Sequence, residues 1–350
     1  MMPPNQLGYH WPAEWEPHAA TWLAWPHNLE SWPGHFDPVR PQMSRFVRAI
    51  ADVEPVHVLA GGRAVMHSAR LWVGDHPNVT LHDFPTDDAW CRDYGPVFLQ
   101  SSDQLPPALI DWKYNAWGDK YPPFDNDNAV PRQIARLTGC RRFEAPLVLE
   151  GGSIEGNGAG LLLTTEQCLL NPNRNPGWER QQIEQVLHDY LGVRKTIWLT
   201  GGQMAGDDTD GHIDQLARFV DSQTVVAAVE DDPNDLNYGP LQENYVLLQT
   251  TTDVQGAPLH VVPLPMPRPK FQDDQRLPAS YCNFYLANGL CVVPQFDDPA
   301  DERAVAILRS LLPDRRVIGL PALDLVFGLG AFHCLSQQQP QPSDGQRFSR

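Results

Sequence analysis

The sequence predicts an α/β protein assembled from repeated small modules, and three observations support this fold class. Runs of strand length come in sets of two or three, and each set is accompanied by one amphipathic helix. This set recurs about five times, at intervals of about 70 residues. The 34 prolines and 26 glycines indicate many short elements joined by tight turns. A doubly wound sheet would instead alternate single strands with single helices.

Periodicity of apolar residues locates the individual elements. In residues 42–53 the apolar side chains of Met43, Phe46, Val47 and Ile50 recur at the spacing of one helix face. Helices are expected at 42–53, 62–72, 127–138, 178–191, 234–250 and 300–312. Apolar runs of strand length lie at 21–25, 56–61, 78–84, 97–100, 108–114, 147–165 (a cluster broken by glycines), 196–200, 215–220, 224–230, 259–265, 282–287, 290–296 and 316–322.

No linker rich in proline, glycine or serine divides the chain. Residues 1–340 are therefore expected to form a single domain, and the polar residues 341–350 a flexible tail.

Composition excludes several classes of partner. The net charge is −17, so the chain repels nucleic-acid phosphates and anionic lipid, and neither is expected as a partner. No apolar stretch reaches the ~18 residues of a membrane span, and the N-terminus lacks the pattern of a signal peptide. Six cysteines without a CxxC pair indicate reduced thiols and a cytoplasmic location. No glycine-rich phosphate-binding motif occurs, so no nucleotide is expected.

Two short segments place a carboxylate where packing alone does not require one. WCRDYGP (90–96) puts Asp93 on a turn between aromatic residues, although a structural ion pair with Arg92 is the alternative. LEGGSIEGNG (149–158) places Glu150 at the end of an apolar strand. A carboxylate that is buried at such a point must be paired, or it retains its proton. The alternative for Glu150 is a solvated turn residue.

A third segment, GDDTDGHIDQLARF, gathers four aspartates around one histidine. If this segment is a strand, His212 and Asp214 point to the same side, because side chains alternate along a strand. An imidazole beside a carboxylate can transfer protons and hold a cation, and the pair also suits a divalent metal. The alternative is an acidic loop that is solvated or calcium-binding, in which Asp207, Asp208 and Asp210 take part.

The fourth segment, GLGAFHCLSQQQP, places a cysteine beside a glycine run and a polar stretch. Cys334 therefore borders a loop that a substrate can reach, whereas Cys291 lies within an apolar strand. The alternative is that Cys334 is a small core residue. His333 is expected to point away from the cysteine if the segment is extended, so it is not assigned as a base.

Together these groups suit nucleophilic attack on a cationic carbon. A thiolate would attack, an imidazole would carry protons, and acidic side chains would hold the positive group. A zinc site needs three or four ligands, and the sequence offers one His-x-Asp without a second His or Cys pair. No metal is therefore expected.

The motifs, in this order, resemble the agmatine deiminase branch of the guanidino-group-modifying enzymes, near the bacterial peptidyl-arginine deiminase type. The matching stretches run from residue 12 to residue 340, and they are PAEWEPHAATWLAWPH, WCRDYGP, YNAWGDKYPPFDNDN, LEGGSIEGNG, LLTTEQCLLNPNRNP, GDDTDGHIDQLARF, SYCNFYLANG and FHCLSQQQP. The resemblance implies a pseudo-fivefold α/β propeller, with ββαβ modules around a central site. That fold agrees with the five modules counted above.

The resemblance also implies a role for each motif residue. Cys334 matches the family's nucleophile and His212 its general acid/base, while Asp93 and Asp214 match the carboxylates that grip the guanidinium. Three further residues match substrate-binding positions, and they are Glu150, Asp208 and Trp90.

The implied activity is hydrolytic deimination of agmatine to N-carbamoylputrescine and ammonia, through a covalent amidino-cysteine and with no metal or organic cofactor. The only implied partner is a small cationic guanidino substrate, and formation of a homo-oligomer stays open. Deimination of arginine in peptides, or of another guanidino compound, is the main alternative. A metal-dependent hydrolase and a non-enzymatic binder of cationic metabolites are two others.

Two departures from the family pattern bear on the substrate. Agmatine deiminases often read GGGNIHC where this chain has GLGAFHC, and many have a histidine where Glu155 stands. Both departures are expected to touch the pocket without removing a catalytic group. The second cation of agmatine is expected to meet Trp90 or the acids Asp87 and Asp88.

Overall fold

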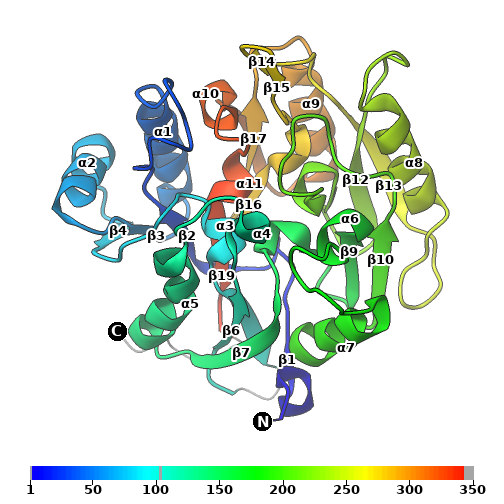
Figure 1. Ribbon diagram of the computed structural model, residues 1–350, viewed down its shortest axis with the longest axis horizontal. Coiled ribbons are helices and arrows are strands. Elements are labelled where there is room, and N and C mark those ends of the chain that lie inside the picture. Colours follow the sequence, from blue (N-terminus) through cyan, green and yellow to red (C-terminus); the bar gives the residue numbers. More distant parts are fainter. Residues whose placement is uncertain (1, 102–104, 343–350) are drawn as a thin grey trace.

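The computed structural model describes residues 2–101 and 105–342 and confirms the α/β class. Within these ranges the strands form five mixed sheets of three or four strands, together with a two-stranded ribbon. Figure 1 shows the sheets spread around the middle of the molecule, where the short helices α3 (Cys91–Tyr94), α4 (Ala116–Asp119) and α11 (Phe332–Leu335) lie. Residues 343–350, most of the expected tail, lie outside the described residues.

The five sheets share one pattern of pairing. Each contains an antiparallel pair and a parallel pair, and a helix connects the parallel strands along the chain, as parallel pairing requires. In order of neighbouring strands, the sheets are β1 (Tyr9–His10), β5 (Val97–Ser101), β6 (Ala108–Lys113) and β7 (Arg141–Val148); β10 (Lys195–Leu199), β9 (Leu161–Thr165) and β8 (Glu155–Gly156); β11 (Ala217–Phe219), β12 (Thr224–Val229) and β13 (His260–Pro265); β16 (Tyr285–Ala287), β17 (Leu290–Gln295) and β18 (Arg316–Pro321); and β19 (Ser336–Pro340), β2 (His18–Ala24), β3 (Val56–Leu59) and β4 (Val79–His82). The ribbon pairs β14 (Phe271–Gln272) with β15 (Gln275–Arg276).

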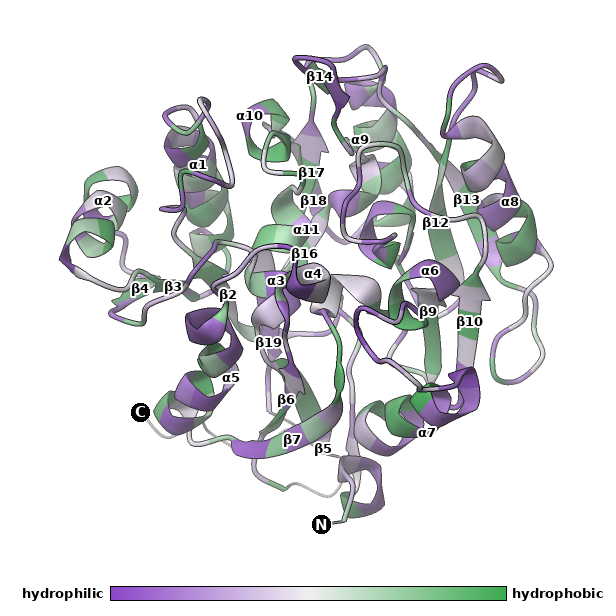
Figure 2. Cartoon of the chain, viewed as in Figure 1, coloured by the Kyte–Doolittle hydropathy of each residue, from purple (hydrophilic) through white to green (hydrophobic). Residues whose placement is uncertain are grey.

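The six long helices lie where the periodicity predicts them. Their apolar stripes are buried against the sheets, and Met43, Phe46, Val47 and Ile50 of α1 are all fully buried. Figure 2 shows hydrophilic and hydrophobic residues side by side on the long helices, as expected for elements with one face in the core. These helices are α1 (Val39–Ala51), α2 (Arg63–Val73), α5 (Asp125–Thr138), α7 (Arg180–Leu191), α8 (Tyr238–Gln249) and α9 (Asp301–Leu311).

The predicted strands depart from the structure where the chain turns toward the centre. The segments expected as strands at 215–220 and 282–287 begin with single 3₁₀ turns, and the cluster at 147–165 is interrupted by another. A 3₁₀ turn is tighter than a strand and reverses the chain within a few residues. The remaining short helices are η1 (Pro4–Leu7), η2 (Gly151–Ser153), η3 (Ile213–Gln215), η4 (Tyr281–Asn283), α6 (Glu166–Leu169) and α10 (Leu323–Val326).

Among the helices formed by residues 2–101 and 105–342, none is both long enough and apolar enough to cross a bilayer.

Candidate active site

Four short helical turns bring distant parts of the sequence together at the centre. The turn α11 contacts α3, α3 contacts η2, and η2 contacts η3. A further turn, η4, packs against both α11 and η3. Asp93 lies on α3, Asp214 on η3 and Cys334 on α11, while Glu150 and His212 immediately precede η2 and η3. Five of the seven sequence-predicted site residues therefore meet in one place.

Cys334 borders a cavity of about 190 Å³ that Asp93, Trp90 and Trp117 also line. Its Sγ accepts a hydrogen bond from Asn283 Nδ2 at 3.1 Å and lies 3.4 Å from Asp214 Oδ2. Burial, and then the charges of Asp214 and Asp93, raise the pKa of Cys334 well above its ordinary value. The thiol of Cys334 is therefore protonated at neutral pH in the free protein.

Small residues allow the chain to reach this position. A Cβ on Gly330 would lie 2.5 Å from the ring of Trp90 and 3.0 Å from Cys334 Cβ, so only glycine fits there. Leu329, one of the departures noted above, lines the cavity with a φ of 71°, a left-handed conformation that is unfavourable for leucine. The Asn283 side-chain oxygen accepts hydrogen bonds from the backbone N–H groups of Ala331, His333 and Cys334, which fixes the α11 turn.

His212 is a buried imidazole between two carboxylates. Its Nδ1 lies 3.6 Å from Asp93 Oδ1, and its Nε2 lies 3.9 Å from Glu150 Oε2. Burial alone would lower the pKa of His212, but the neighbouring anions, led by Asp93, raise it well above the ordinary value. The ring is therefore an imidazolium that can donate a proton at neutral pH.

The three buried carboxylates of the site have different electrostatic environments. Burial raises the pKa of Asp93 to about 6, although its oxygens accept hydrogen bonds from Gly152 N and Trp117 Nε1. The pKa of Glu150 is about 2, because Arg174 Nε lies 2.8 Å from Oε1 and outweighs the effect of burial. The pKa of Asp214 is also lowered against burial, through the hydrogen bond and the charge of His333.

Glycine leaves open the point where these groups converge. A Cβ on Gly152 would lie 2.6 Å from His212 Nδ1, 2.7 Å from Asp93 Oδ1 and 3.1 Å from Asp214 Oδ2. Two buried carboxylate oxygens, Glu150 Oε2 and Asp214 Oδ1, have no hydrogen-bond partner. The site is therefore a small anionic space with unused acceptors beside a thiol.

The other two predicted site residues lie farther out. Trp90 lines the cavity and packs against Trp32, with ring centroids 5.2 Å apart. Asp208 is half-buried at the outer wall, where Tyr121 Oη donates to its carboxylate, so it does not join the group around the thiol.

The acidic loop is not a calcium-like loop. Asp207 accepts hydrogen bonds from Thr209 and Gly211 within its own turn, and Asp210 pairs with Lys120 and Arg174. His212 and Asp214 approach the same point, but around the η3 turn rather than by alternation along a strand.

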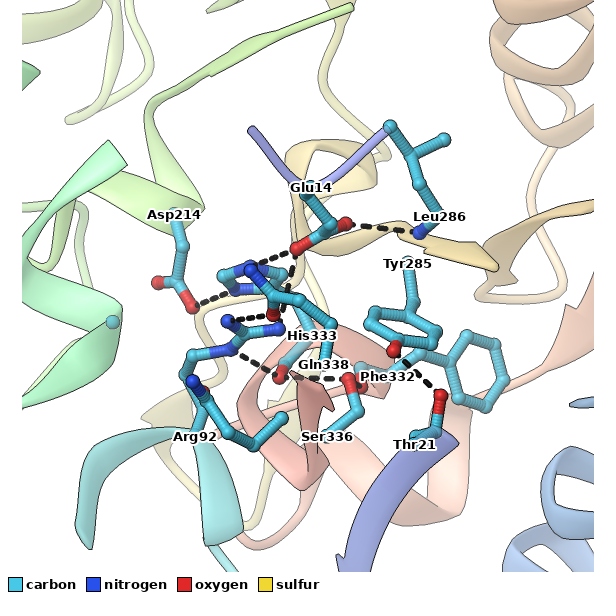
Figure 3. A network of polar contacts seen from close by, with 12 residues as sticks. Glu14, Thr21, Arg92, Asp214, Tyr285, Leu286, Phe332, His333, Ser336 and Gln338 are labelled. Carbon is cyan, nitrogen blue, oxygen red and sulfur yellow. Dashed lines mark hydrogen bonds and ion pairs between the residues drawn. The ribbon is translucent and has the colours of Figure 1, made fainter. Parts of the chain in front are cut away.

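Behind the cavity lies a buried ionic network that the sequence did not predict (Figure 3). The extended segment on which the expected orientation of His333 depended does not form, because α11 is a helical turn. His333 Nδ1 lies 2.7 Å from Asp214 Oδ2, and Nε2 lies 2.9 Å from Glu14 Oε2. Glu14 also contacts Arg218 Nη2 at 2.8 Å and Arg92 Nη2 at 3.2 Å. The Arg218 guanidinium, with the His333 ring, holds the pKa of Glu14 well below its usual range despite burial.

Glu155 belongs to this network and not to the pocket, contrary to the expectation from the sequence. Its carboxylate accepts a hydrogen bond from Arg218 Nε at 2.9 Å and from Phe219 N at 2.9 Å. The ion pair expected as the alternative for Arg92 and Asp93 does not form either. Arg92 instead reaches Glu14 and Gln338, where its Nη1 donates to Gln338 Oε1 at 2.7 Å.

The sequence did contain signals for some of the residues that were missed. Trp117 and Asn283 lie in YNAWGDKYPPFDNDN and SYCNFYLANG, and Glu14 lies in PAEWEPHAATWLAWPH, all of which carried the resemblance without an assigned role. Their partners could not be read from the chain, because each lies tens to hundreds of residues away.

The class that this arrangement defines is that of the guanidino-group-modifying enzymes, whose substrates present a planar cation to a thiol. A family model described as Porphyromonas-type peptidyl-arginine deiminase matches residues 10–340, and the chain belongs to that family.

Individual relatives agree with this assignment. The chain is 39% identical to an agmatine deiminase of Ectopseudomonas mendocina, with 97% of each chain covered. It is similar to the structure of an Enterococcus faecalis agmatine deiminase, with a TM-score of 0.92, 31% identity and coverage of 98% of this chain and 99% of the other. It is also similar to a cysteine-to-serine variant of the C. jejuni agmatine deiminase with substrate bound, with a TM-score of 0.87, 30% identity and coverage of 95% and 97%.

Proposed function

We propose that this protein is an agmatine deiminase, which hydrolyses agmatine to N-carbamoylputrescine and ammonia. Two buried carboxylate oxygens without a hydrogen-bond partner carry the proposal: Asp214 Oδ1, on the side chain that contacts the Cys334 thiol, and Glu150 Oε2, beside His212. A buried acceptor without a partner is costly, and a guanidinium offers N–H donors in one plane. Asp93 and Asp214 would grip the substrate from two sides while Cys334 faces its central carbon.

The outer cavity favours a substrate with a second positive charge. Glu30, Asp88 and Asp208 line it, and no lysine or arginine is among the described lining residues. A free amine at the far end is attracted to these acids, with Trp90 supplying an aromatic face. The α-carboxylate of free arginine would meet like charges there. Burial raises the pKa of Asp88 to about 6, so an approaching ammonium would favour its ionised form.

The reaction follows from the protonation states of these groups. As the guanidinium pairs with Asp93 and Asp214, it cancels the charges that raise the pKa of Cys334, and the thiol loses its proton to solvent, where that proton later meets the released ammonia. The thiolate then forms a bond to the guanidinium carbon. His212 donates its proton to one amino nitrogen, and ammonia leaves to give an amidino-cysteine (an S-alkylthiouronium).

The second half of the reaction regenerates the enzyme. Neutral His212 takes a proton from water, and the resulting hydroxide attacks the same carbon. The carbon–sulfur bond breaks, and the proton on the newly added oxygen passes to the departing sulfur, which releases the ureido product and restores the Cys334 thiol. In each turnover His212 therefore gives one proton and takes one proton.

A panel of guanidino compounds tests the proposal directly. Agmatine, arginine, a guanidino acid and a blocked arginine peptide are incubated with the protein, and ammonia and the ureido product are measured. We expect agmatine to give the highest kcat/KM. Absence of ammonia from agmatine would refute the proposal.

Deimination of peptidyl-arginine is the second candidate, because the matching family model carries that description. A blocked peptide lacks a free amine at the far end, so the acids of the outer cavity give it no advantage. A higher kcat/KM for the peptide than for agmatine in the same panel would favour this candidate.

The repeated sheets support a further proposal about the architecture. We propose that the five sheets form a pseudo-fivefold propeller within a single domain over residues 1–340, because each repeats the ββαβ order and their central turns carry the site.

The cysteines support a proposal about the location. We propose a cytoplasmic location, since all six cysteines are free thiols that are buried. Localisation of a tagged chain by cell fractionation tests this location.

A further inference from the structure

We propose that Glu150, Cys168 and His212 form a binding site for a divalent cation of the zinc class, and that a bound metal blocks deimination. One ligand atom from each residue lies within 4.8 Å of the other two, and all three residues are buried. They come from the loop after β7, from α6 and from the segment before η3. Because these segments are separate in the sequence, the three residues do not form a recognisable metal-binding motif.

Two of the three ligand atoms are unpartnered. Glu150 Oε2 and His212 Nε2 have no hydrogen-bond partner, although the side chains are 0% and 1% exposed. These two atoms lie 3.9 Å apart. Tetrahedral zinc, with bonds of about 2.0–2.3 Å, separates neighbouring ligand atoms by roughly 3.3–3.8 Å. A shift of a few tenths of an ångström therefore brings the oxygen and the nitrogen to coordination distance.

The outer contacts are those that a metal site requires. A metal-binding imidazole usually presents its other ring nitrogen to a carboxylate, and a ligating carboxylate is itself held by a donor. His212 Nδ1 faces Asp93 Oδ1 at 3.6 Å, and Glu150 Oε1 accepts from Arg174 Nε at 2.8 Å. In both side chains, therefore, the polar atom that is not the free ligand atom faces a charged partner.

The ligand set selects the class of metal. A thiolate, an imidazole and a carboxylate suit zinc and similar borderline cations, whereas magnesium and calcium prefer oxygen ligands alone. Three protein ligands leave a fourth position for water. Binding displaces one proton from the Cys168 thiol and one from the His212 ring, so the metal competes with protons for the site.

A metal at this position opposes the proposed reaction in two ways. It occupies the Nε2 lone pair of His212 and prevents the ring from cycling through its protonated form. It also takes Glu150 Oε2, one of the two free acceptors for the guanidinium. The inhibitory effect therefore rests on the proposed function, whereas binding of the metal does not.

Cobalt binding tests the site without any turnover. In a Cys334→Ala variant, which removes the thiol of the cavity and leaves Cys168 in place, we expect Co²⁺ to bind once per chain and to give a thiolate-to-cobalt absorption band. The band should disappear in Cys334→Ala/Cys168→Ser and persist in the matched control Cys334→Ala/Cys140→Ser, with unchanged circular dichroism in all three. A band that persists without Cys168, or that is absent throughout, overturns the proposal.

Agmatine turnover measured at increasing zinc concentration tests whether the bound metal inhibits deimination. We expect zinc to inhibit the wild type, a chelator to restore activity, and Cys168→Ser to need at least about tenfold more zinc for the same inhibition. Equal sensitivity of Cys168→Ser and the wild type would overturn the inhibitory part. If the wild type has no agmatine turnover, the proposed function fails, and the cobalt result still decides the site.

Discussion

The carboxylates on the two sides of the His333 ring differ in how completely they are paired. On the cavity side, Asp214 and Glu150 each keep one buried oxygen without a partner. On the far side, both oxygens of Glu14 and of Glu155 accept hydrogen bonds from arginine, histidine or backbone donors. The same chemical group is therefore left ready for a ligand on one side and fully used on the other. Substitutions on the cavity side should reduce turnover, and those on the far side should reduce stability.

Removal of the thiol is expected to have the largest effect. Cys334→Ala should lower ammonia release from agmatine by on the order of 10⁴-fold or more, because no other described residue of the cavity offers a thiol. Thermal unfolding should change little, since the side chain is small. Turnover near the wild-type value would show that the cavity side does not work through this cysteine.

Neutralising Glu14, at the centre of the buried ionic network, should instead reduce the stability of the protein. Glu14→Gln leaves Arg218, Arg92 and His333 without their shared anion, so the free energy of unfolding should fall by about 3–5 kcal/mol in urea titrations. The matched change Glu16→Gln, two residues away, affects one local hydrogen bond and should cost about 1 kcal/mol or less. Equal losses in the free energy of unfolding for Glu14→Gln and Glu16→Gln would contradict a stabilising role of the network.

His333 joins the two sides, and two substitutions separate its contacts. Asparagine can keep a donor near the position of Nδ1, which faces Asp214, and glutamine can keep one near Nε2, which faces Glu14. We expect His333→Asn to retain about 10–100-fold more kcat/KM than His333→Gln, because Asp214 stays oriented. We expect His333→Gln to be the more stable. The reverse order of activities would assign His333 a purely structural role.

The raised pKa of Asp93 predicts the acidic limb of the pH profile. Because Asp93 must be ionised to hold the cation, kcat/KM should fall about tenfold per pH unit below about pH 6. The folded-state pKa exceeds that of the unfolded chain, so this group favours folding below about pH 4, and that contribution is lost as the pH rises through about 6. Asp88 has a similar pKa. If the fall of kcat/KM at acidic pH disappears in Asp88→Asn, that fall arises from Asp88 in the outer cavity and not from Asp93.

The smallest effect concerns the strained residue at the cavity wall. Leu329→Gly removes a left-handed leucine and should raise the free energy of unfolding by about 1 kcal/mol or less. Asp297→Gly, at an exposed residue with a φ of 54°, should give a smaller gain and leave KM unchanged. Because only Leu329 lines the cavity, a change in the KM for agmatine is expected for this variant alone. A loss of stability in Leu329→Gly would contradict the assignment of strain.

Local patterns predicted the elements better than the contacts between them. The helix periodicity located the buried stripe of α1, because that signal depends only on neighbours in the chain. The single turns η3 and η4 were mistaken for strand, since one 3₁₀ turn leaves no periodicity. The same error placed His212 and Asp214 on a strand, although they do approach each other.

The candidate site was predictable where chemistry and sequence context coincide. A cysteine beside glycines and an Arg-Asp pair on a turn are locally unusual, and Cys334 and Asp93 do share a cavity. Glu14 could not be assigned, because its partners are 78 to 319 residues away. The position of Asp208 at the outer wall of the same cavity could not be read from the sequence, because membership of an acidic run does not indicate which side chains turn inward.

The pairing of β19 with β2 has a consequence for biosynthesis. The α11 turn that carries residue 334 leads directly into β19, and that strand pairs with one formed by residues 18–24. The reactive sulfur can therefore dock only after both of these strands, which lie far apart in the sequence, have been synthesised.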